Sequence, residues 1–358
     1  MLTIFLIAYL ILTTSCQTAD RQIKKIDEEL MVAVPLSELY IRVRGNPNGA
    51  LILNLHGGPG GYSGIDIQLM GPWLEEDYLL AYLDQRGCGK SPGCTDTSML
   101  TVEQYVQDLD IVIDSLLNRF GKKALNLIGT SWGGMYGFLY LLHNQDKVNA
   151  FACIDGKVNS HYQNHSLIDY ELKLIDSLLK DKCSRAGETE LIMIQQELIR
   201  IQESNFEQFH TDVNRLKHEF PPKLGFNAYF ADTSKVISLT DVLEDTALLN
   251  LMKYTREEYL KVGEKAEIVN EAFRNTPSYN NMNIEDELKN ISIPVAVIQG
   301  RKDYVVGIGQ GELIYSALAN LSDKKELHLI PNTGHCPAIE NPELLQGILN
   351  DFFNKYTY

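Results

Sequence analysis

The sequence predicts an α/β fold in which a mostly parallel sheet carries helices on both faces and receives a helical lid as an insertion. From residue 50 to about residue 155, short apolar runs alternate with amphipathic stretches, the pattern of a parallel sheet with crossover helices. Strand-like runs disappear between residues 157 and 290 and then return. The predicted core therefore comprises residues 23–156 and 291–358, and residues 157–290 form the lid.

The first part of the core is expected to begin with a β-hairpin over residues 23–45 that turns near Pro35. Between residues 102 and 120, apolar side chains recur at helical spacing, and Gly121 is expected to end that helix. The short apolar runs predict four buried strands, Ala50–Leu55, Leu79–Leu83, Ala124–Ile128 and Ala150–Ile154.

The sequence pattern changes from helices in the lid to strands in the second part of the core. Three charge-rich segments of the lid predict helices, over residues 167–179, 190–201 and 257–273. Beyond the lid, two strands are expected over residues 294–299 and 325–330, followed by a closing helix over residues 342–356.

The composition is that of a globular protein and excludes one class of partner. Apolar residues make up 44% of the chain and charged residues 22%, so a core can be buried. The net charge of −15 has the wrong sign for gripping a phosphate backbone, so no nucleic-acid partner is expected. A small molecule or a short peptide is the expected substrate.

Residues 1–16 are interpreted as a signal peptide or lipoprotein signal. The apolar run Leu2–Leu12 is too short to span a bilayer and suits a secretory signal. The small residues before Cys16 resemble the lipobox of bacterial lipoproteins, which predicts lipidation of Cys16. We therefore expect an exported protein, anchored by lipid to a membrane and facing the periplasm or the cell exterior. Secretion without lipid, a short anchor and a chain that is not exported are the alternatives.

The cysteines and histidines predict no metal site. Cys88 and Cys94 are the candidates for a disulfide in an oxidising compartment, but the chain has no CxxC motif. His161 and His165 lie four residues apart on a predicted helix without a third ligand nearby. No metal is therefore expected.

The segment Gly129–Gly133, with the sequence GTSWG, follows a predicted strand and opens a predicted helix. This is the setting of a nucleophile elbow, in which a tight turn exposes a serine hydroxyl, here that of Ser131. Ser91 stands in a similar GxSxG pattern. Because the oxyanion hole uses the backbone N–H of the residue after the nucleophile and Pro92 has none, Ser91 is excluded.

The glycine-rich segment His56–Gly61 follows the strand ending at Leu55 and is predicted to supply the oxyanion hole. A backbone N–H here, that of Gly58, is the expected second donor beside the N–H of Trp132. His56 is expected to hold this loop by hydrogen bonds rather than to act as a base. The spacing of the glycines fits neither a Rossmann nor a Walker motif.

Asp303 and His335 follow the two predicted strands of the second core segment and complete a candidate triad with Ser131. The order Ser, Asp, His along the chain is that of an α/β-hydrolase triad. His335 would take the Ser131 proton, and Asp303 would fix the His335 tautomer. Asp155, at the end of the preceding strand, is the alternative acid.

Three motifs together resemble the prolyl aminopeptidase (proline iminopeptidase) branch of the α/β-hydrolases. They are the HGGPG loop at His56–Gly60, the DQRGCGKS segment at Asp84–Ser91 and the GTSWGG elbow at Gly129–Gly134. The resemblance covers residues 50–155 and 292–356. It implies a hydrolase of this fold that uses the triad without a metal or an organic cofactor, with an aminopeptidase as the best-supported activity.

The lid departs from that branch. The Trp-x-x-Trp-Glu-like stretch whose glutamate helps to hold the substrate amine in the branch is absent. The acidic lid residues Glu171, Glu203 and Glu207 are available for that role, but the sequence singles out none of them. A carboxylesterase or lactonase with the same triad is therefore the alternative, and a catalytically silent binding protein is a third hypothesis from another class.

Intact-mass analysis of the native protein tests the predicted export signal. We expect the mature chain to begin at or near Cys16 and to carry the added mass of more than one acyl chain, because one chain anchors a protein only marginally. A chain that retains residues 1–15 with an unmodified Cys16 would contradict both processing and anchoring. A soluble product cleaved near Ser15 would contradict the lipid alone.

Overall fold

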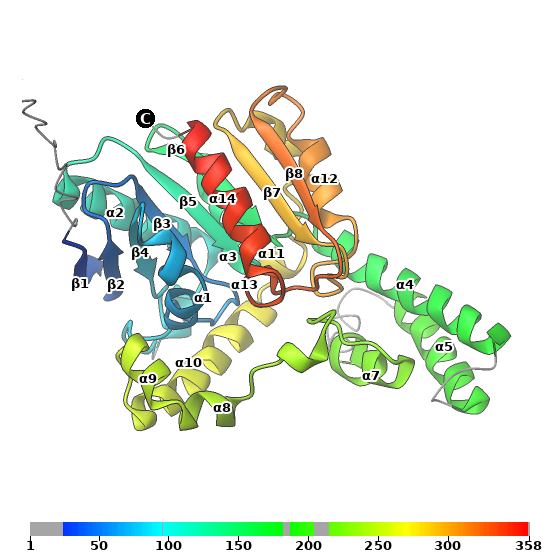
Figure 1. Ribbon diagram of the computed structural model, residues 1–358. Helices are drawn as coiled ribbons and strands as arrows, with labels where there is room; N and C mark the ends of the chain where they lie inside the picture. Colours follow the sequence, from blue (N-terminus) through cyan, green and yellow to red (C-terminus); the bar gives the residue numbers. More distant parts are fainter. Residues whose placement is uncertain (1–23, 95, 182–186, 204–214, 357–358) are drawn as a thin grey trace, which may run out of the picture.

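The computed structural model describes residues 24–94, 96–181, 187–203 and 215–356 (Figure 1). The predicted signal segment 1–16, with the lipidation candidate Cys16, lies outside these residues. In the described part of the chain, no helix combines the length and the hydrophobicity of a membrane span.

One eight-stranded sheet forms the centre of the fold, with the strand order β1-β2-β4-β3-β5-β6-β7-β8. The hairpin β1–β2 is antiparallel and pairs β4 antiparallel, whereas all later neighbours are parallel. The predicted fold class is therefore confirmed. The strands are β1 (Ile26–Val34), β2 (Ser37–Gly45), β3 (Leu51–Leu55), β4 (Leu79–Leu83), β5 (Leu125–Thr130), β6 (Val148–Ile154), β7 (Val295–Gly300) and β8 (Lys325–Ile330).

Successive residues of a strand point to opposite faces of the sheet, so both faces are apolar here, and helices cover both. On one face, Leu53 and Leu127 pack with the helices α2 (Val102–Phe120), α3 (Trp132–Leu141) and α12 (Gln310–Ala317). On the other face, Ile52 and Ile128 pack with α1 (Gly64–Leu74) and α14 (Pro342–Tyr356). As predicted, α2 ends at Gly121, whose left-handed backbone forms the C-cap.

The segment between β6 and β7 consists of helices that form two groups (Figure 1). The first group buries an apolar cluster among α4, α5 and α7. The second buries a separate cluster among α8, α9 and α10. The short helices α8 and α9 were not predicted, since neither is long enough to show helical periodicity. The bounds are α4 (Ser160–Asp181), α5 (Glu188–Glu203), α7 (Phe220–Leu224), α8 (Leu239–Glu244), α9 (Thr246–Met252), α10 (Arg256–Arg274) and α11 (Pro277–Asn280).

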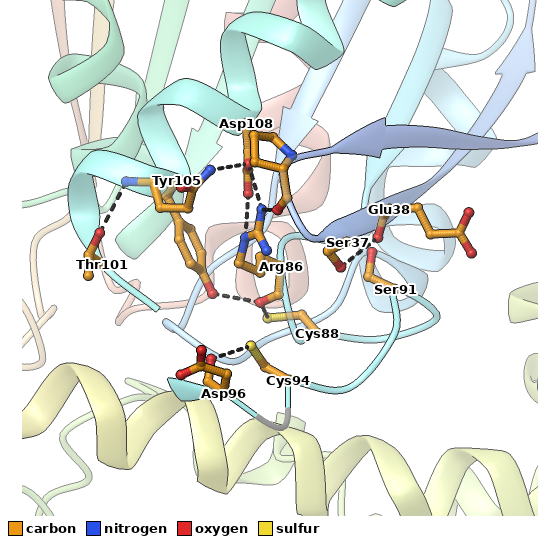
Figure 2. A network of polar contacts seen from close by, with 12 residues as sticks. Ser37, Glu38, Arg86, Cys88, Ser91, Cys94, Asp96, Thr101, Tyr105 and Asp108 are labelled. Carbon is orange, nitrogen blue, oxygen red and sulfur yellow. Dashed lines mark hydrogen bonds and ion pairs between the residues drawn. The ribbon is translucent and has the colours of Figure 1, made fainter. Parts of the chain in front are cut away.

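A buried ion pair fixes the loop after β4 (Figure 2). The Arg86 guanidinium donates to both carboxylate oxygens of Asp108 on α2, at 2.7 and 2.9 Å, and also to the Pro35 carbonyl at 2.9 Å. Tyr105, one helical turn before Asp108, donates its hydroxyl to the Arg86 carbonyl at 2.6 Å. The loop is thereby attached both to α2 and to the turn of the N-terminal hairpin.

Cys88 and Cys94 flank this network but are free thiols. Their sulfur atoms contact the carbonyl oxygens of Arg86 and Asp96 respectively (Figure 2). The disulfide considered from the sequence is therefore not formed in this structure.

The substitution Asp108→Ala tests the contribution of the buried pair. Because it leaves the Arg86 charge buried without a partner, we expect the free energy of unfolding to fall by about 3–5 kcal/mol. Glu28→Ala is the control, since its pair with Arg119 is exposed and is expected to contribute less than about 1 kcal/mol. Urea unfolding followed by circular dichroism measures both, and equal losses would contradict the assignment.

Candidate active site

The turn between β5 and α3 holds Ser131 in a strained backbone conformation. Its φ of 55° and ψ of −117° lie outside the regions that residues with side chains normally adopt. Gly133 permits the turn, because a Cβ at this position would collide with the carbonyl oxygen of Leu55 in β3. The turn presents Ser131 to a cavity above the carboxyl edge of the sheet.

Two hydrogen bonds connect Ser131 to a buried carboxylate through His335. The His335 Nε2 lies 2.9 Å from the Ser131 Oγ, and its Nδ1 lies 2.9 Å from the Asp303 Oδ2. His335 stands in the loop between β8 and α13 (Pro337–Glu340), where its backbone N–H donates to the Tyr229 carbonyl of the lid at 2.6 Å. The structure thus brings Ser131, Asp303 and His335 together from three separate loops.

Backbone donors fix the orientation of the Asp303 carboxylate. Asp303 is fully buried in the loop after β7. Its Oδ1 accepts the N–H groups of Val305 and Val306 at 2.9 and 3.2 Å, which leaves Oδ2 directed toward His335. An aspartate held in this way can keep the imidazole in a single tautomer and orientation.

Asp155, the alternative acid, lies beside Asp303 at the end of β6. Its Oδ1 accepts the Gly300 N–H at 2.9 Å. Burial, with the nearby Asp303 charge, raises the pKa of Asp155 well above its usual range, so the site disfavours a negative charge on this carboxyl. The His335 Nδ1 is hydrogen-bonded to Asp303, whereas no such bond to Asp155 is formed, which favours Asp303 as the acid of the site.

Asp155, Asp303 and His335 also have ligand-type atoms within 4.8 Å of one another, the only such group among the described residues. In this group, the Nδ1 of His335 and the Oδ2 of Asp303 are already joined by a hydrogen bond. Metal ligands must be deprotonated and must converge on one point, whereas burial raises the pKa of Asp155 and so opposes its deprotonation. We therefore interpret the three side chains as an acid–base cluster rather than as a metal centre.

Two backbone N–H groups at the cavity have no acceptor among the described residues. Trp132 is the first residue of α3, so its N–H has no partner within the helix. Gly58, in the loop after β3, has a φ of 134°, and a Cβ at this position would lie 2.6 Å from the Gly60 nitrogen. Both residues line the cavity with Ser131. The structure thus places both residues predicted for the oxyanion hole at the same cavity as the candidate nucleophile.

Gln85 joins the glycine-rich loop to α3, a role that its place in the Asp84–Ser91 segment did not reveal. The Gln85 side chain donates to the His56 carbonyl at 2.9 Å and accepts the indole N–H of Trp132 at 2.8 Å. The Gln85 backbone N–H donates to the His56 Nε2 at 3.2 Å. The His56 Nδ1 therefore donates to the Gly57 carbonyl at 2.8 Å, and the ring is neutral because burial lowers its pKa. His56 holds the loop in place.

Ser91 has a structural environment. It is fully buried, its Oγ donates to the Asp84 carbonyl at 2.6 Å, and the same oxygen accepts the Tyr40 N–H at 2.9 Å. Ser91 does not line the cavity that contains Ser131. Both hydrogen-bonding capacities of its hydroxyl are used to connect β2 to the loop after β4.

The cavity has a volume of about 1390 Å³ and lies between the sheet edge and the lid. Asp66 on α1 is the only carboxyl side chain among the described residues that line it. Its Oδ2 accepts a hydrogen bond from Asn54 at 2.7 Å, and burial raises its pKa to about 7. Most of the remaining lining is neutral.

None of the described acidic lid residues considered for amine binding lines the cavity. Glu171 is buried on α4, where burial raises its pKa to about 9. Glu203, at the end of α5, is exposed. Glu207 lies outside the described residues.

Residues 50–180 match the family described as alpha/beta hydrolase fold. The proline iminopeptidase of Heyndrickxia coagulans is 23% identical over 316 residues, which are 87% of this chain and 92% of that protein. The "Putative proline iminopeptidase" of Mycoplasma genitalium is 34% identical over 112 residues, 31% of this chain and 34% of that protein. The chain is thus matched over only about a third of the second relative.

Solved structures share the fold at low sequence identity. The proline iminopeptidase-related protein of Thermus thermophilus has a TM-score of 0.62 and 19% identity, over 92% of this chain and 98% of that chain. The proline iminopeptidase of Mycobacterium smegmatis has a TM-score of 0.62 and 17% identity, over the same shares of the two chains. Together with the family match, these likenesses confirm the predicted α/β-hydrolase fold and the sequence resemblance.

Asparagine substitutions at the two neighbouring carboxyls test which one serves the histidine. We expect Asp303→Asn to lower kcat for 4-nitrophenyl acetate by about 10⁴-fold, because an amide does not hold the required tautomer. Asp155→Asn introduces an isosteric amide at a carboxyl that makes no hydrogen bond to His335, so it should lower kcat less than about tenfold. If Asp155→Asn causes the larger loss, Asp303 is not the acid of the site.

Proposed function

Since this chain is an α/β-hydrolase by fold and resembles the proline iminopeptidases in sequence, we propose that it is a serine hydrolase that cleaves acyl bonds. The observation that carries the proposal is the pair of 2.9 Å hydrogen bonds from Asp303 through His335 to Ser131. A nucleophile, a base and an orienting acid in this arrangement are the equipment of acyl transfer to water.

In the proposed first step, the Ser131 oxygen attacks the substrate carbonyl carbon while His335 Nε2 takes the hydroxyl proton. The tetrahedral intermediate collapses as His335 returns that proton to the leaving amine or alcohol, which leaves an ester on Ser131. Water then attacks the ester, His335 takes a proton from the water, and the acid product leaves with Ser131 protonated again. Asp303 stabilises the imidazolium in both halves.

The oxyanion of each tetrahedral intermediate would be bound by the N–H groups of Gly58 and Trp132. Donors of this kind stabilise charge only as it develops, which raises kcat rather than substrate affinity. The N-terminus of α3 adds its partial positive charge at the same point. Protein groups and water supply each step, so the proposed reaction needs neither a metal nor an organic cofactor.

For the substrate, we propose a short peptide in an aminopeptidase-like reaction. The sequence relatives that are proline iminopeptidases support this choice. Asp66 lines the cavity, where its carboxyl can bind the amine of such a substrate. Hydrolysis of a small ester or lactone is the second candidate. It is favoured by the absence of any other carboxyl from the described cavity lining and by the pKa of about 7 of Asp66, which leaves an amine only a partly ionised partner.

Export and lipid anchoring at Cys16 remain part of the proposal. They are supported by the apolar run Leu2–Leu12 and the small residues before the cysteine. The substrate would then be met outside the cytoplasm.

Two serine variants test the proposed chemistry. Ser131→Ala should lower hydrolysis of 4-nitrophenyl acetate and of proline 4-nitroanilide by at least about 10³-fold, because the nucleophile is lost. Ser91→Ala should retain most of the activity. A fluorophosphonate probe should label the unaltered protein and the Ser91 variant but not the Ser131 variant. An unlabelled but folded protein without turnover would instead support the hypothesis of a silent binding protein.

The anilide and the ester also separate the two substrate classes. Turnover of the anilide at a rate comparable with that of the ester would support the aminopeptidase. Turnover of the ester alone would support the second candidate.

A further inference from the structure

The charged side chains that line the cavity are mainly cationic, although the chain as a whole carries a net charge of −15. Lys157, Lys217 and Arg274 line it, and Asp66 is the only described carboxyl that does so. In a chain with 47 acidic and 32 basic residues, a cavity lined by three cations and one carboxyl is opposite in sign to the rest of the protein. Charges of one sign in a low-dielectric cleft select the complementary ligand.

Lys157 enters the cavity from the core, two residues after Asp155. Its ammonium donates to the side-chain oxygen of Gln163 at 2.9 Å and lies 4.9 Å from the centre of the Tyr279 ring. Neither contact neutralises the charge, because an amide and an aromatic ring are both uncharged. Lys157 therefore presents an ammonium to the cavity without a carboxylate partner in the described part of the chain.

Lys217 enters the same cavity from the lid, in the single π-helical turn Arg215–Glu219. No hydrogen bond or ion pair joins its ammonium to another described residue, and it is half-buried. The pKa of Lys157 is lowered to about 7, mainly by burial and in addition by the nearby charge of Lys217. The Asp303 charge opposes the effect of burial on the pKa of Lys217, but no carboxylate forms an ion pair with either lysine in the described part of the chain. Two ammonium groups that face one cavity without a paired carboxylate are costly until an anion binds between them.

The third cation stands at the C-terminal end of α10. Arg274 is exposed, and its guanidinium lies 3.5 Å from Glu267 in an ion pair that water screens. Asparagine side chains, whose amides are neutral hydrogen-bond donors, also line the cavity. Among them are Asn270, Asn275, Asn280 and Asn281.

We propose that the cavity binds a substrate with a carboxylate group, which Lys157 and Lys217 hold while Ser131 attacks the acyl carbon. The inference rests on the proposed function and specifies its substrate class. The C-terminal carboxylate of a short peptide and the free carboxylate of an acid ester have this chemistry in common. Burial also lowers the pKa of Lys217 to about 8, so the pair carries less than two full charges near neutral pH, which suits a carboxylate better than a doubly charged phosphate.

Matched esters that differ only in charge test the proposal. One set places the charge on the leaving group, with 4-acetoxybenzoate, its neutral methyl ester and 4-acetoxybenzylamine. The other places it on the acyl group, with the 4-nitrophenyl monoester of adipic acid and 4-nitrophenyl hexanoate. We expect kcat/KM for the anion to exceed that for its neutral partner by about tenfold in at least one set, as for one charge-assisted contact.

Lysine variants connect that preference to the cavity. Lys217→Gln and Lys157→Gln should each reduce the ratio of anionic to neutral turnover by about fivefold to tenfold. Lys217→Glu should move the preference toward the ammonium ester. Lys173→Gln is the matched control, because Lys173 is exposed on α4, does not line the cavity and should leave the ratio unchanged. Labelling by a neutral fluorophosphonate checks that each variant retains a folded, reactive site.

The outcomes separate this inference from the function on which it rests. Turnover that depends on Ser131 but is equal for anionic and neutral esters in both sets overturns the carboxylate site and leaves the hydrolase standing. An anionic preference that survives both lysine substitutions also overturns it. Failure of labelling and of turnover for every ester in the unaltered protein overturns the proposed function itself. A stronger preference for 4-acetoxyphenyl phosphate than for 4-acetoxybenzoate would replace the carboxylate by a phosphate.

Discussion

The close approach of helix α3 to the end of strand β3 is the constraint on which the site depends. At Gly133 the helix backbone passes so near the Leu55 carbonyl that no side chain fits between them. Ser131, two residues earlier, has unusual backbone angles, and the same contact places the start of the helix beside His56 of the glycine-rich loop. The placement of the candidate nucleophile and of Trp132, one of the two proposed oxyanion donors, is therefore linked to one packing contact between a strand and a helix.

Buried polar interactions next to this contact hold the surrounding loops in place. Gln85 bridges the glycine-rich loop and the indole of Trp132, so the two halves of the oxyanion site are held by one amide. The next residue, Arg86, attaches the loop after β4 to α2 through Asp108. Since these groups are buried, the loop has few alternative arrangements that satisfy them. A preorganised site of this kind avoids reorganisation when charge develops.

The core and the positions of the reactive groups were predictable from the sequence, because the carboxyl ends of parallel strands share one edge of a sheet. Ser131, Asp303 and His335 each follow a strand at that edge. The sequence favoured Asp303 and left Asp155 as the alternative, since both follow strands, and the hydrogen bond from His335 to Asp303 is what distinguishes them in the structure. Lys217 was beyond prediction because its irregular lid segment has no periodic pattern that would indicate which side chains face the cavity.

The two apolar clusters of the lid rest on different parts of the core. The first includes Tyr304 and Val305, which follow Asp303 in the loop after β7. The second packs against Tyr62, next to the glycine-rich loop. Because the clusters share no member among the described residues, changes in one should combine additively with changes in the other. The lid is thus modular, and natural variation can reshape one wall of the cavity while the opposite wall and the candidate nucleophile keep their geometry.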